Sequence, residues 1–287
     1  MIIGFLGSGQ LGFLVLKELK MHFAINFVMT DKMSLDIILF CTEQQIRFFA
    51  GNPRNGRSLD QLSGIKCDLL ISVNYLFLVE KDILQLPLKR AVNFHGSLLP
   101  KYRGRTPHVW AIVNNEKETG VTAHLMSDEC DAGDIIAQLV IPITTTDTGQ
   151  AILEKFKLVY PQFVVEVVEK IMGDDYQLSK QDHHLATYFG KRTPEDGLIN
   201  WKWHKERIYN WVRALASPYP GAFSYYNGYK LIINEIEFFD LGFNFEDPNG
   251  TIVKIENGMP IIKTPNGCVK LLKFDCDNTL DVNTVLE

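Results

Sequence analysis

Apolar residues occur in short blocks along the first two thirds of the chain, and each block ends at glycine or at polar residues. The blocks at residues 2–6, 24–29, 69–73 and 91–94 have the length of buried strands, whereas residues 11–19 carry apolar positions at helical spacing. Strands that alternate with helices are typical of a mostly parallel sheet covered on both faces. This part of the chain is therefore predicted to form a Rossmann-like α/β fold.

The same part of the chain continues with two further strands and a long helix. Strands are expected at residues 121–126 and 135–141, and the acidic turn 127–134 separates them. Thr148 has the side chain of a helix N-cap and precedes an amphipathic stretch that ends near Gly173.

The pattern changes in the last third of the chain. Residues 176–200 are polar, residues 205–215 have helical spacing, and short β-rich runs then alternate with four Asn-Gly pairs. Asn-Gly between β-rich runs favours tight hairpins, which predicts a small β-rich antiparallel domain, either a barrel (OB-like) or a sandwich. The predicted organisation is a Rossmann-like catalytic domain at 1–180, a linker at 181–204 and a small β-rich domain at 205–287.

Composition narrows the class of protein. Of 287 residues, 46% are hydrophobic and 22% are charged, as in ordinary soluble domains. No apolar run is long enough for a membrane span, and the N-terminus lacks the basic and apolar regions of a secretory signal. The five cysteines are scattered without a CxxC pair, which indicates a reducing cytoplasm with neither structural zinc nor disulfides.

A glycine motif is the first candidate for a binding site. Gly7-x-Gly9-x-x-Gly12 follows a predicted strand and opens a predicted helix, and Asp31 lies at the end of the next strand. This arrangement matches the fingerprint of dinucleotide binding in spelling and in context. The alternative is a glycine turn that only brings a helix N-terminus close to another substrate.

A second candidate follows the strand at residues 91–94. Asn93 and His95 are two residues apart, so both side chains point to the same side of the strand end. Asp131 lies in the acidic turn after another strand, and its loop can reach the same edge of the sheet. An amide, an imidazole and a carboxylate together can polarise a carbonyl group and move a proton.

The residues around this candidate resemble a known family. The run Asn-Phe-His-Gly-Ser-Leu-Leu-Pro-Lys-Tyr-Arg-Gly at 93–104 is similar to that of the formyltransferases that use N10-formyltetrahydrofolate. The resemblance extends over residues 118–122, 131–134, 188–196 and 212–214, and thus over most of the chain. It implies a Rossmann-like catalytic domain followed by a small barrel.

The resemblance also implies residue roles. Asn93, His95 and Asp131 would be the catalytic residues: Asn93 and an imidazole N–H of His95 would donate to the developing oxyanion, and Asp131 would favour protonated His95. No metal would be required. The co-substrate N10-formyltetrahydrofolate would contact two loops, through Ser72, Asn74, Tyr75, Leu76, Leu125, Met126, Asp128 and Asp131.

Within the family, residues 217–224 look most like members that formylate nucleotide sugars, such as UDP-4-amino-4-deoxyarabinose formyltransferase. The expected acceptor is therefore a UDP- or dTDP-linked amino sugar for surface polysaccharide such as lipopolysaccharide O-antigen. Arg103 and Arg105 suit a pyrophosphate, although either could instead pair with a carboxylate. Aromatic residues could stack the base or be core. The residues expected to contact this substrate are Gly7, Ser8, Gly9, Arg103, Arg105, Tyr219 and Phe223.

Three questions stay open at this level. One alternative is methionyl-tRNA formylation, but acidic residues outnumber basic ones 34 to 29, which disfavours a nucleic-acid partner. The other is a nicotinamide-dependent oxidoreductase or a nucleotide-binding module, which the glycine motif alone would favour. The sequence also leaves homodimer formation open.

Overall fold

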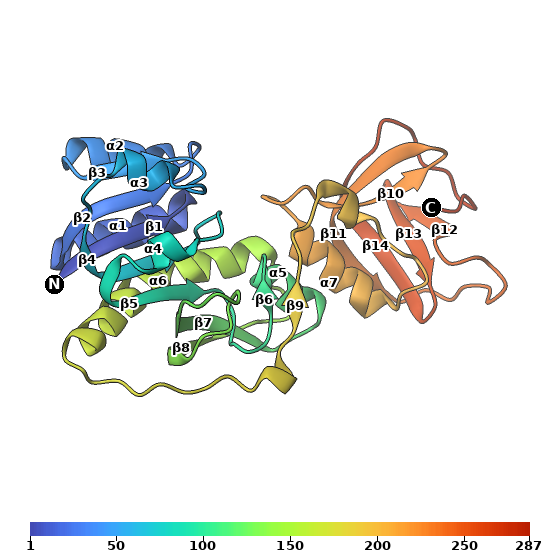
Figure 1. Cartoon of the computed structure of the whole chain (residues 1–287). Coiled ribbons are helices and arrows are strands. Elements are labelled where there is room, and N and C mark those ends of the chain that lie inside the picture. The colour runs from blue at the N-terminus through green and yellow to red at the C-terminus, as the bar shows by residue number, and fades with distance from the viewer. The chain divides into compact units, whose positions relative to one another are not determined.

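The computed structural model describes residues 1–287 and contains two compact units (Figure 1). The first unit comprises Met1–Gly104, Thr119–Ile141 and Glu154–Phe189, and the second comprises Arg105–Glu118, Pro142–Leu153 and Gly190–Glu287. The second unit thus includes two segments that the predicted boundaries assign to the first domain. No single cut along the chain separates the two units.

The first unit is built on a seven-stranded sheet with the order β3-β2-β1-β4-β5-β7-β8. The strands from β3 to β5 are parallel, and β7 is antiparallel to β5. This confirms the predicted Rossmann-like, mostly parallel sheet. The strands are β1 (Ile2–Gly7), β2 (Ala24–Thr30), β3 (Arg47–Ala50), β4 (Cys67–Val73), β5 (Pro87–His95), β7 (Glu118–Leu125) and β8 (Ile135–Pro142).

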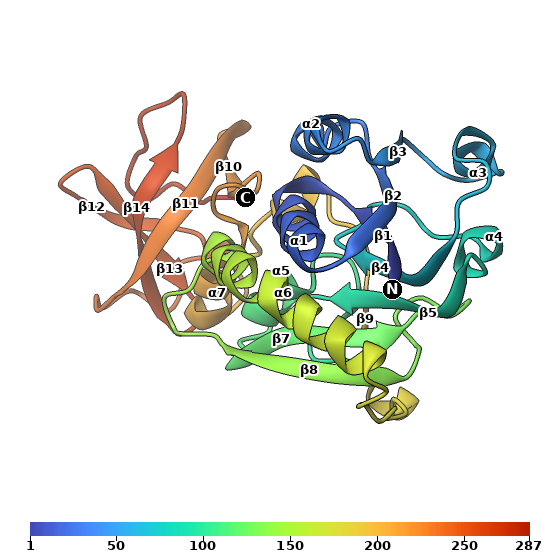
Figure 2. The same ribbon diagram turned by 90° about the vertical axis from the view of Figure 1, so that its left-hand side faces the viewer.

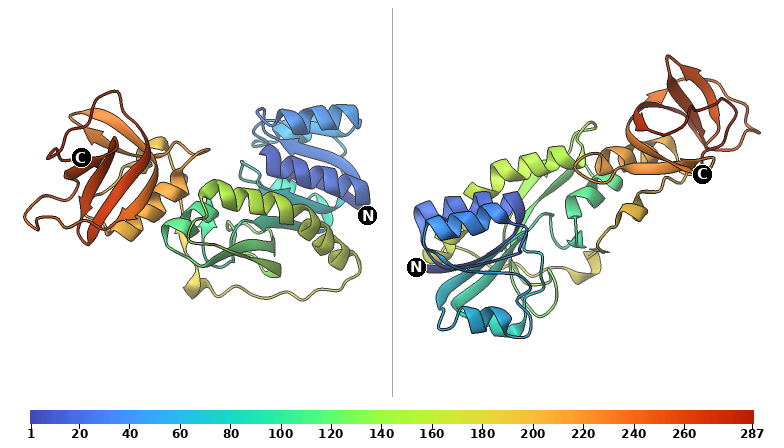
Figure 3. Two further views of the ribbon diagram at one scale, coloured as in Figure 1. Left: turned by 180° about the vertical axis from the view of Figure 1, so that it is seen from behind. Right: turned by 90° about the horizontal axis from the view of Figure 1, so that it is seen from above.

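Helices cover both faces of this sheet, as Figures 2 and 3 show. Helices α1 (Gly9–His22), α2 (Leu35–Glu43) and α6 (Gly149–Met172) lie on one face, and α3 (Arg57–Gln61) and α4 (Lys81–Leu84) lie on the other. On the α3 and α4 side, apolar strand residues pack against residues from the two short helices. Because both faces are buried, polar groups that act on a ligand are confined to the strand ends.

After α6 the chain runs back along the first unit as an extended segment, coloured yellow in Figure 1. Residues 176–189 of this segment are here called the strap. The strap contains the short helix η1 (His183–Leu185) and ends in β9 (Tyr188–Phe189), which pairs in parallel with β6 (Arg103–Gly104). The predicted linker therefore begins as an ordered part of the first unit.

The second unit contains a five-stranded antiparallel sheet with the order β10-β11-β14-β13-β12. Asn227-Gly228 and Asn257-Gly258 have positive φ at both residues and form two-residue hairpin turns, which confirms the β-rich prediction. The elements are α5 (Pro107–Val113), η2 (Pro194–Gly197), α7 (Lys205–Leu215), β10 (Ala222–Tyr226), β11 (Tyr229–Phe239), β12 (Ile252–Glu256), β13 (Met259–Thr264) and β14 (Gly267–Asp275).

Candidate active site

Asn93 and His95 lie at the carboxyl end of β5, where the sheet changes from parallel to antiparallel. Strand β5 pairs with β4 on one side and β7 on the other, so Asn93 is opposite His124 and His95 is opposite Thr122. Because side chains alternate along a strand, Asn93 and His95 point to the same side. The strand end therefore presents an amide and an imidazole next to each other.

Asp131 approaches this pair from the loop between β7 and β8. Its Oδ2 atom accepts a 2.9 Å hydrogen bond from the Gly104 backbone N–H and is 3.6 Å from His95 Nδ1. Its Oδ1 atom is 3.5 Å from Asn93 Nδ2. The Asp131 side chain is only 9% exposed. The structure thus brings the three predicted catalytic residues together, and their roles remain a prediction.

His124 belongs to the same cluster and was missed by the sequence analysis. Its Nε2 atom is 3.1 Å from Asn93 Nδ2 and 3.6 Å from Asp131 Oδ1. Its Nδ1 atom is 2.9 Å from the Leu125 carbonyl oxygen, which can only accept, so the ring proton is at Nδ1 and Nε2 accepts from Asn93. The available signal was a histidine within an otherwise apolar predicted strand.

Two opposing effects act on the pKa of His95. Burial lowers the pKa of His95, and this outweighs the attraction of Asp131, which would raise it. The Nε2 atom is 2.7 Å from the Tyr102 carbonyl oxygen and therefore carries the ring proton. At neutral pH, His95 is thus a neutral imidazole whose Nδ1 lone pair faces Asp131 and can accept a proton.

Asp131 remains ionised in this buried setting. Burial alone would raise its pKa, but His95 and His124, which are positively charged when protonated at low pH, and the Gly104 N–H hold the pKa well below the usual range of a carboxyl group. The adjacent Cys130 thiol is exposed, and its Sγ atom is 3.4 Å from Asp131 Oδ2. The site therefore combines a fixed negative charge, a neutral proton acceptor and an amide donor.

The residues predicted to contact the formyl donor lie in two loops of the first unit. Ser72 lies near the end of β4 and residues 74–76 in the loop after it, whereas Leu125 ends β7 and residues 126–128 and Asp131 lie in the loop after it. Since β4 and β7 are the two sheet neighbours of β5, these loops flank Asn93 and His95. In detail, Ser72 is buried, Asn74 and Leu76 are exposed, Tyr75, Leu125 and Met126 are half-buried, and Asp128 forms an exposed ion pair with Lys81.

The glycine turn after β1 is occupied by groups of the chain itself. The Gly9 N–H donates to Ser34 Oγ at 2.8 Å, and this hydroxyl donates to Asp31 Oδ2 at 2.5 Å. Asp31 is 7% exposed and also accepts from the Met33 N–H. Its carboxylate therefore caps its own loop, where a dinucleotide enzyme would use it for a ribose hydroxyl. Of the residues predicted to bind substrate here, Gly9 is exposed, and Gly7 and Ser8 are buried.

The predicted pyrophosphate contact of Arg103 does not fit its surroundings. Arg103 is 0% exposed, and its guanidinium donates to Gln181 Oε1 and to the Tyr188 hydroxyl. His183 Nδ1 lies 3.4 Å from its Nη2 atom. No donor of this side chain reaches solvent, because Arg103 instead fastens the strap to the loop after β5. Arg105, the other predicted arginine, is exposed and belongs to the second unit.

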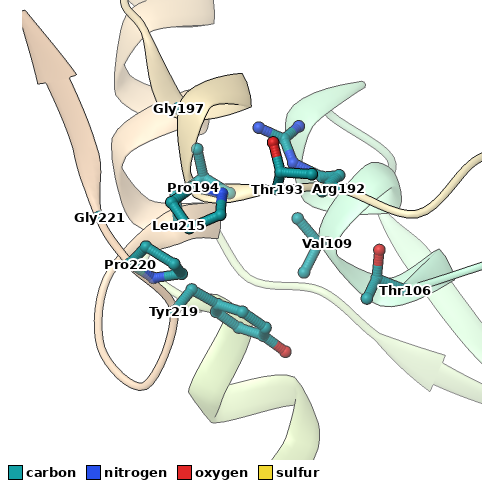
Figure 4. Close-up of a pocket in the computed structure, with 10 residues that line it drawn as sticks. All are labelled: Thr106, Val109, Arg192, Thr193, Pro194, Gly197, Leu215, Tyr219, Pro220 and Gly221. Carbon is teal, nitrogen blue, oxygen red and sulfur yellow. The ribbon is translucent and has the colours of Figure 1, made fainter.

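The two aromatic residues predicted to stack a base lie in the second unit. Phe223 is buried in the core with the Lys230 ammonium 4.1 Å from its ring centroid, so its role is packing. Tyr219 donates to or accepts from His108 Nε2 at 2.5 Å. It also borders a mostly apolar cavity of about 120 Å³, beside Val109 and Leu215 (Figure 4).

No helix has both the length and the apolar composition that a membrane crossing needs. No three histidine, cysteine or acidic side chains are grouped so that they could hold a metal ion.

Two family models match the chain. The model of the formyl transferase family matches residues 36–168, and that of the formyl transferase C-terminal domain matches residues 191–286. A curated relative, the bifunctional polymyxin resistance protein ArnA of Wigglesworthia glossinidia brevipalpis, is 39% identical over 186 residues. This match covers 65% of the present chain and 28% of ArnA, so the chain spans little more than a quarter of that relative.

Several solved structures share the fold. The N-formyltransferase of Helicobacter canadensis, solved with folinic acid and dTDP-3-aminofucose, is 21% identical with a TM-score of 0.73, over 94% of this chain and 99% of that one. The sugar 3N-formyl transferase WlaRD is 20% identical with a TM-score of 0.70, over 98% and 99%. The methionyl-tRNA formyltransferase of Clostridium thermocellum is 18% identical with a TM-score of 0.59, over 95% and 100%. At these identities the likeness establishes the fold alone.

Proposed function

Since the chain belongs to the formyl transferase family, we propose that it transfers a formyl group from N10-formyltetrahydrofolate to the amino group of a nucleotide-linked amino sugar. The observation that carries the proposal is the convergence of Asn93, His95 and Asp131 at the end of β5. These groups suit a reaction in which a carbonyl is polarised and an amine loses a proton. The donor, when bound, supplies the activated formyl carbonyl.

Asn93 is the residue that fits the formyl oxygen. One Nδ2 proton is directed to His124 Nε2 at 3.1 Å, which fixes the orientation of the amide. The second makes only a long contact of 3.5 Å with Asp131 Oδ1, so we assign it to the formyl oxygen. In that position it would stabilise the negative charge that develops on this oxygen during attack by the amine.

His95 is the residue that fits the proton transfer. Its neutral Nδ1 atom would take a proton from the amine as the nitrogen bonds to the formyl carbon. The same proton would then return to N10 of tetrahydrofolate as the bond between N10 and the formyl carbon breaks, so protons balance. Asp131, ionised beside Nδ1, would stabilise the imidazolium between these two steps.

The sugar acceptor is supported by two observations. The solved structures with higher TM-scores include sugar N-formyltransferases, one of which carries a dTDP-linked amino sugar, whereas the methionyl-tRNA enzyme has a TM-score of 0.59. The chain also has a net charge of −5, whereas tRNA binding generally depends on clusters of basic residues. A formylated amino sugar of this kind would be used in surface polysaccharide, such as lipopolysaccharide O-antigen.

An acceptor panel tests the proposal. The protein is incubated with N10-formyltetrahydrofolate and, separately, with UDP- and dTDP-linked amino sugars and with initiator methionyl-tRNA, and products are weighed by mass spectrometry. The expected result is a gain of one formyl group on a sugar, absent with Asn93→Ala and His95→Ala. Formylation of the tRNA alone would identify the other branch of the family, and near-normal turnover by both variants would refute the mechanism.

A further inference from the structure

Gln181 lies in the strap and joins three parts of the first unit through one side-chain amide. Its Nε2 atom donates to the carbonyl oxygens of Asp131 at 2.9 Å and Gly133 at 2.7 Å. Its Oε1 atom accepts from Nε and Nη2 of Arg103, at 3.2 and 2.6 Å. The residue is 6% exposed, and all four hydrogen-bonding positions of the amide are used.

The strap is bound to the segments that follow β5 and β7, the two strands next to the candidate catalytic side chains. On one side, Arg103 N–H donates to the Thr187 carbonyl, and β6 pairs with β9. On the other side, Ile135 and Ser179 exchange two backbone hydrogen bonds. Gln181 lies between these two attachments, and its buried amide connects them; the exposed Tyr188 hydroxyl makes a second link, from Arg103 to Glu129.

Each of these loops also contacts a catalytic side chain through its backbone. In the loop after β5, the Tyr102 carbonyl accepts from His95 and the Gly104 N–H donates to Asp131. In the loop after β7, Asp131 itself has φ of +55°, a conformation that non-glycine residues adopt only where their surroundings fix it. The bond from Gln181 to the Asp131 carbonyl is part of those surroundings.

We propose that Gln181 is a positioning residue for the reaction, holding the Asp131 carboxylate against His95 by linking the Asp131 and Gly133 carbonyls to the Arg103 guanidinium. The kinetic part of this inference rests on the proposed formyl transfer. Only a primary amide of this length supplies two donors and a doubly accepting oxygen at one point. The function of the buried Arg103 is then to orient this amide, which explains why its guanidinium faces inward.

Two substitutions of Gln181 distinguish a role in positioning Asp131 from a contribution to the stability of the fold alone. Gln181→Leu removes all four hydrogen bonds, whereas Gln181→Glu keeps the acceptor for Arg103 and loses the donors to Asp131 and Gly133. A matched control is Asn210→Leu, which removes a buried amide oxygen that accepts from Arg213 in the second unit. All three are compared by thermal unfolding and by steady-state kinetics with the acceptor found in the panel.

We expect both Gln181 variants to lose kcat by roughly 10- to 100-fold with KM changed little, because small displacements of a reacting group are costly. The Glu variant should be as slow as the Leu variant although it keeps the Arg103 contact, and Asn210→Leu should lower Tm without lowering kcat. In an Asp131→Asn background, Gln181→Leu should have no further effect on kcat. Activity that follows Tm in all variants, or additive losses in the double variant, would overturn the inference.

A measurement without turnover keeps this test independent of the proposed function. Imidazole NMR follows the titration of His95 in the wild type and in Gln181→Leu. Because Asp131 raises the pKa of His95 against the effect of burial, displacement of the carboxylate should lower this pKa further. An unchanged His95 titration would overturn the positioning role, even if the wild-type protein formylated none of the acceptors.

Discussion

Two carboxylates of the first unit are largely covered by the protein and differ in their partners. Asp31, after β2, is held by a serine hydroxyl and a backbone N–H of its own loop. Asp131, after β7, is held by a backbone N–H of another loop and lies between two imidazoles. A buried carboxylate whose partners are all local completes a turn, whereas one that faces titratable groups from other strands can take part in proton transfer.

The comparison is tested most strongly by removing each negative charge at constant shape. Asp131→Asn should lower kcat by about 1,000-fold, because general acid–base groups contribute in the range of roughly 10² to 10⁴. Asp31→Asn should leave kcat within a few-fold of the wild type. Steady-state kinetics on both variants at equal folded fraction measures this difference, and comparable losses in the two variants would erase the distinction.

Although Asp31 should matter little for kcat, it should matter for the stability of the fold. Asp31→Ala leaves the Ser34 hydroxyl and the Met33 N–H without their acceptor, at a cost of about 1–3 kcal/mol in the free energy of unfolding. Denaturant unfolding monitored by circular dichroism measures the loss. An unchanged midpoint would mean that water replaces the carboxylate at this turn.

The same variant has a defined dependence on pH. Burial would raise the pKa of Asp31, but hydrogen bonds, the largest of them from the Ser34 hydroxyl, outweigh burial and lower the pKa. A carboxyl group with a lowered pKa contributes stability that is present above its unfolded pKa of about 3.9 and is lost as the pH falls through the folded pKa. The stability gap between wild type and Asp31→Ala should therefore be constant above about pH 5 and narrow below about pH 4.

Substitutions of His124 test the same comparison with a smaller expected effect on kcat. The carboxylate of Asp131 has this histidine beside it, whereas that of Asp31 does not. His124→Ala removes the acceptor that orients Asn93, so kcat should fall on the order of 10-fold. His124→Gln, which can present an amide oxygen to Asn93, should recover part of the loss. A recovery in Tm with none in kcat would show that His124 serves packing only.

The smallest expected effect is the absence of one. The Gly9 N–H at the start of α1 is already bonded to Ser34, which is in turn bonded to Asp31. Isothermal titration with NAD or NADP should therefore give no measurable heat of binding. The matched control is Ser34→Ala, which removes the acceptor of the Gly9 N–H without adding a ligand group. Micromolar affinity in the wild type would return the glycine motif to its dinucleotide interpretation.

The sequence predicted the fold class and the β-rich second part because these depend on local signals. Alternating strands and helices give the parallel sheet, and Asn-Gly pairs fix two hairpins. The side-by-side arrangement of Asn93 and His95 follows from their spacing of two on a strand. The short helices α2 and α3 and the strand β3 were not predicted, because elements of four to nine residues carry little periodicity.

The burial of Arg103 could not be read from the sequence. Its partners Gln181 and Tyr188 lie 78 and 85 residues further along the chain, in a segment whose polar composition is typical of a solvent-exposed linker. An arginine beside a catalytic motif therefore has the same local appearance whether it binds a phosphate or an internal amide. Only the tertiary contacts distinguish the two.

The exposed Cys130 gives this site a built-in chemical handle. Cys41, Cys67 and Cys268 are buried, and Cys276 is partly covered, so a maleimide dye used at low stoichiometry should label Cys130 first. The dye would then be attached one residue from Asp131, at the place where a folate is expected to bind. Its fluorescence would report occupancy in real time, and the rate of labelling with and without folate would give a footprint of the site in the unmodified protein.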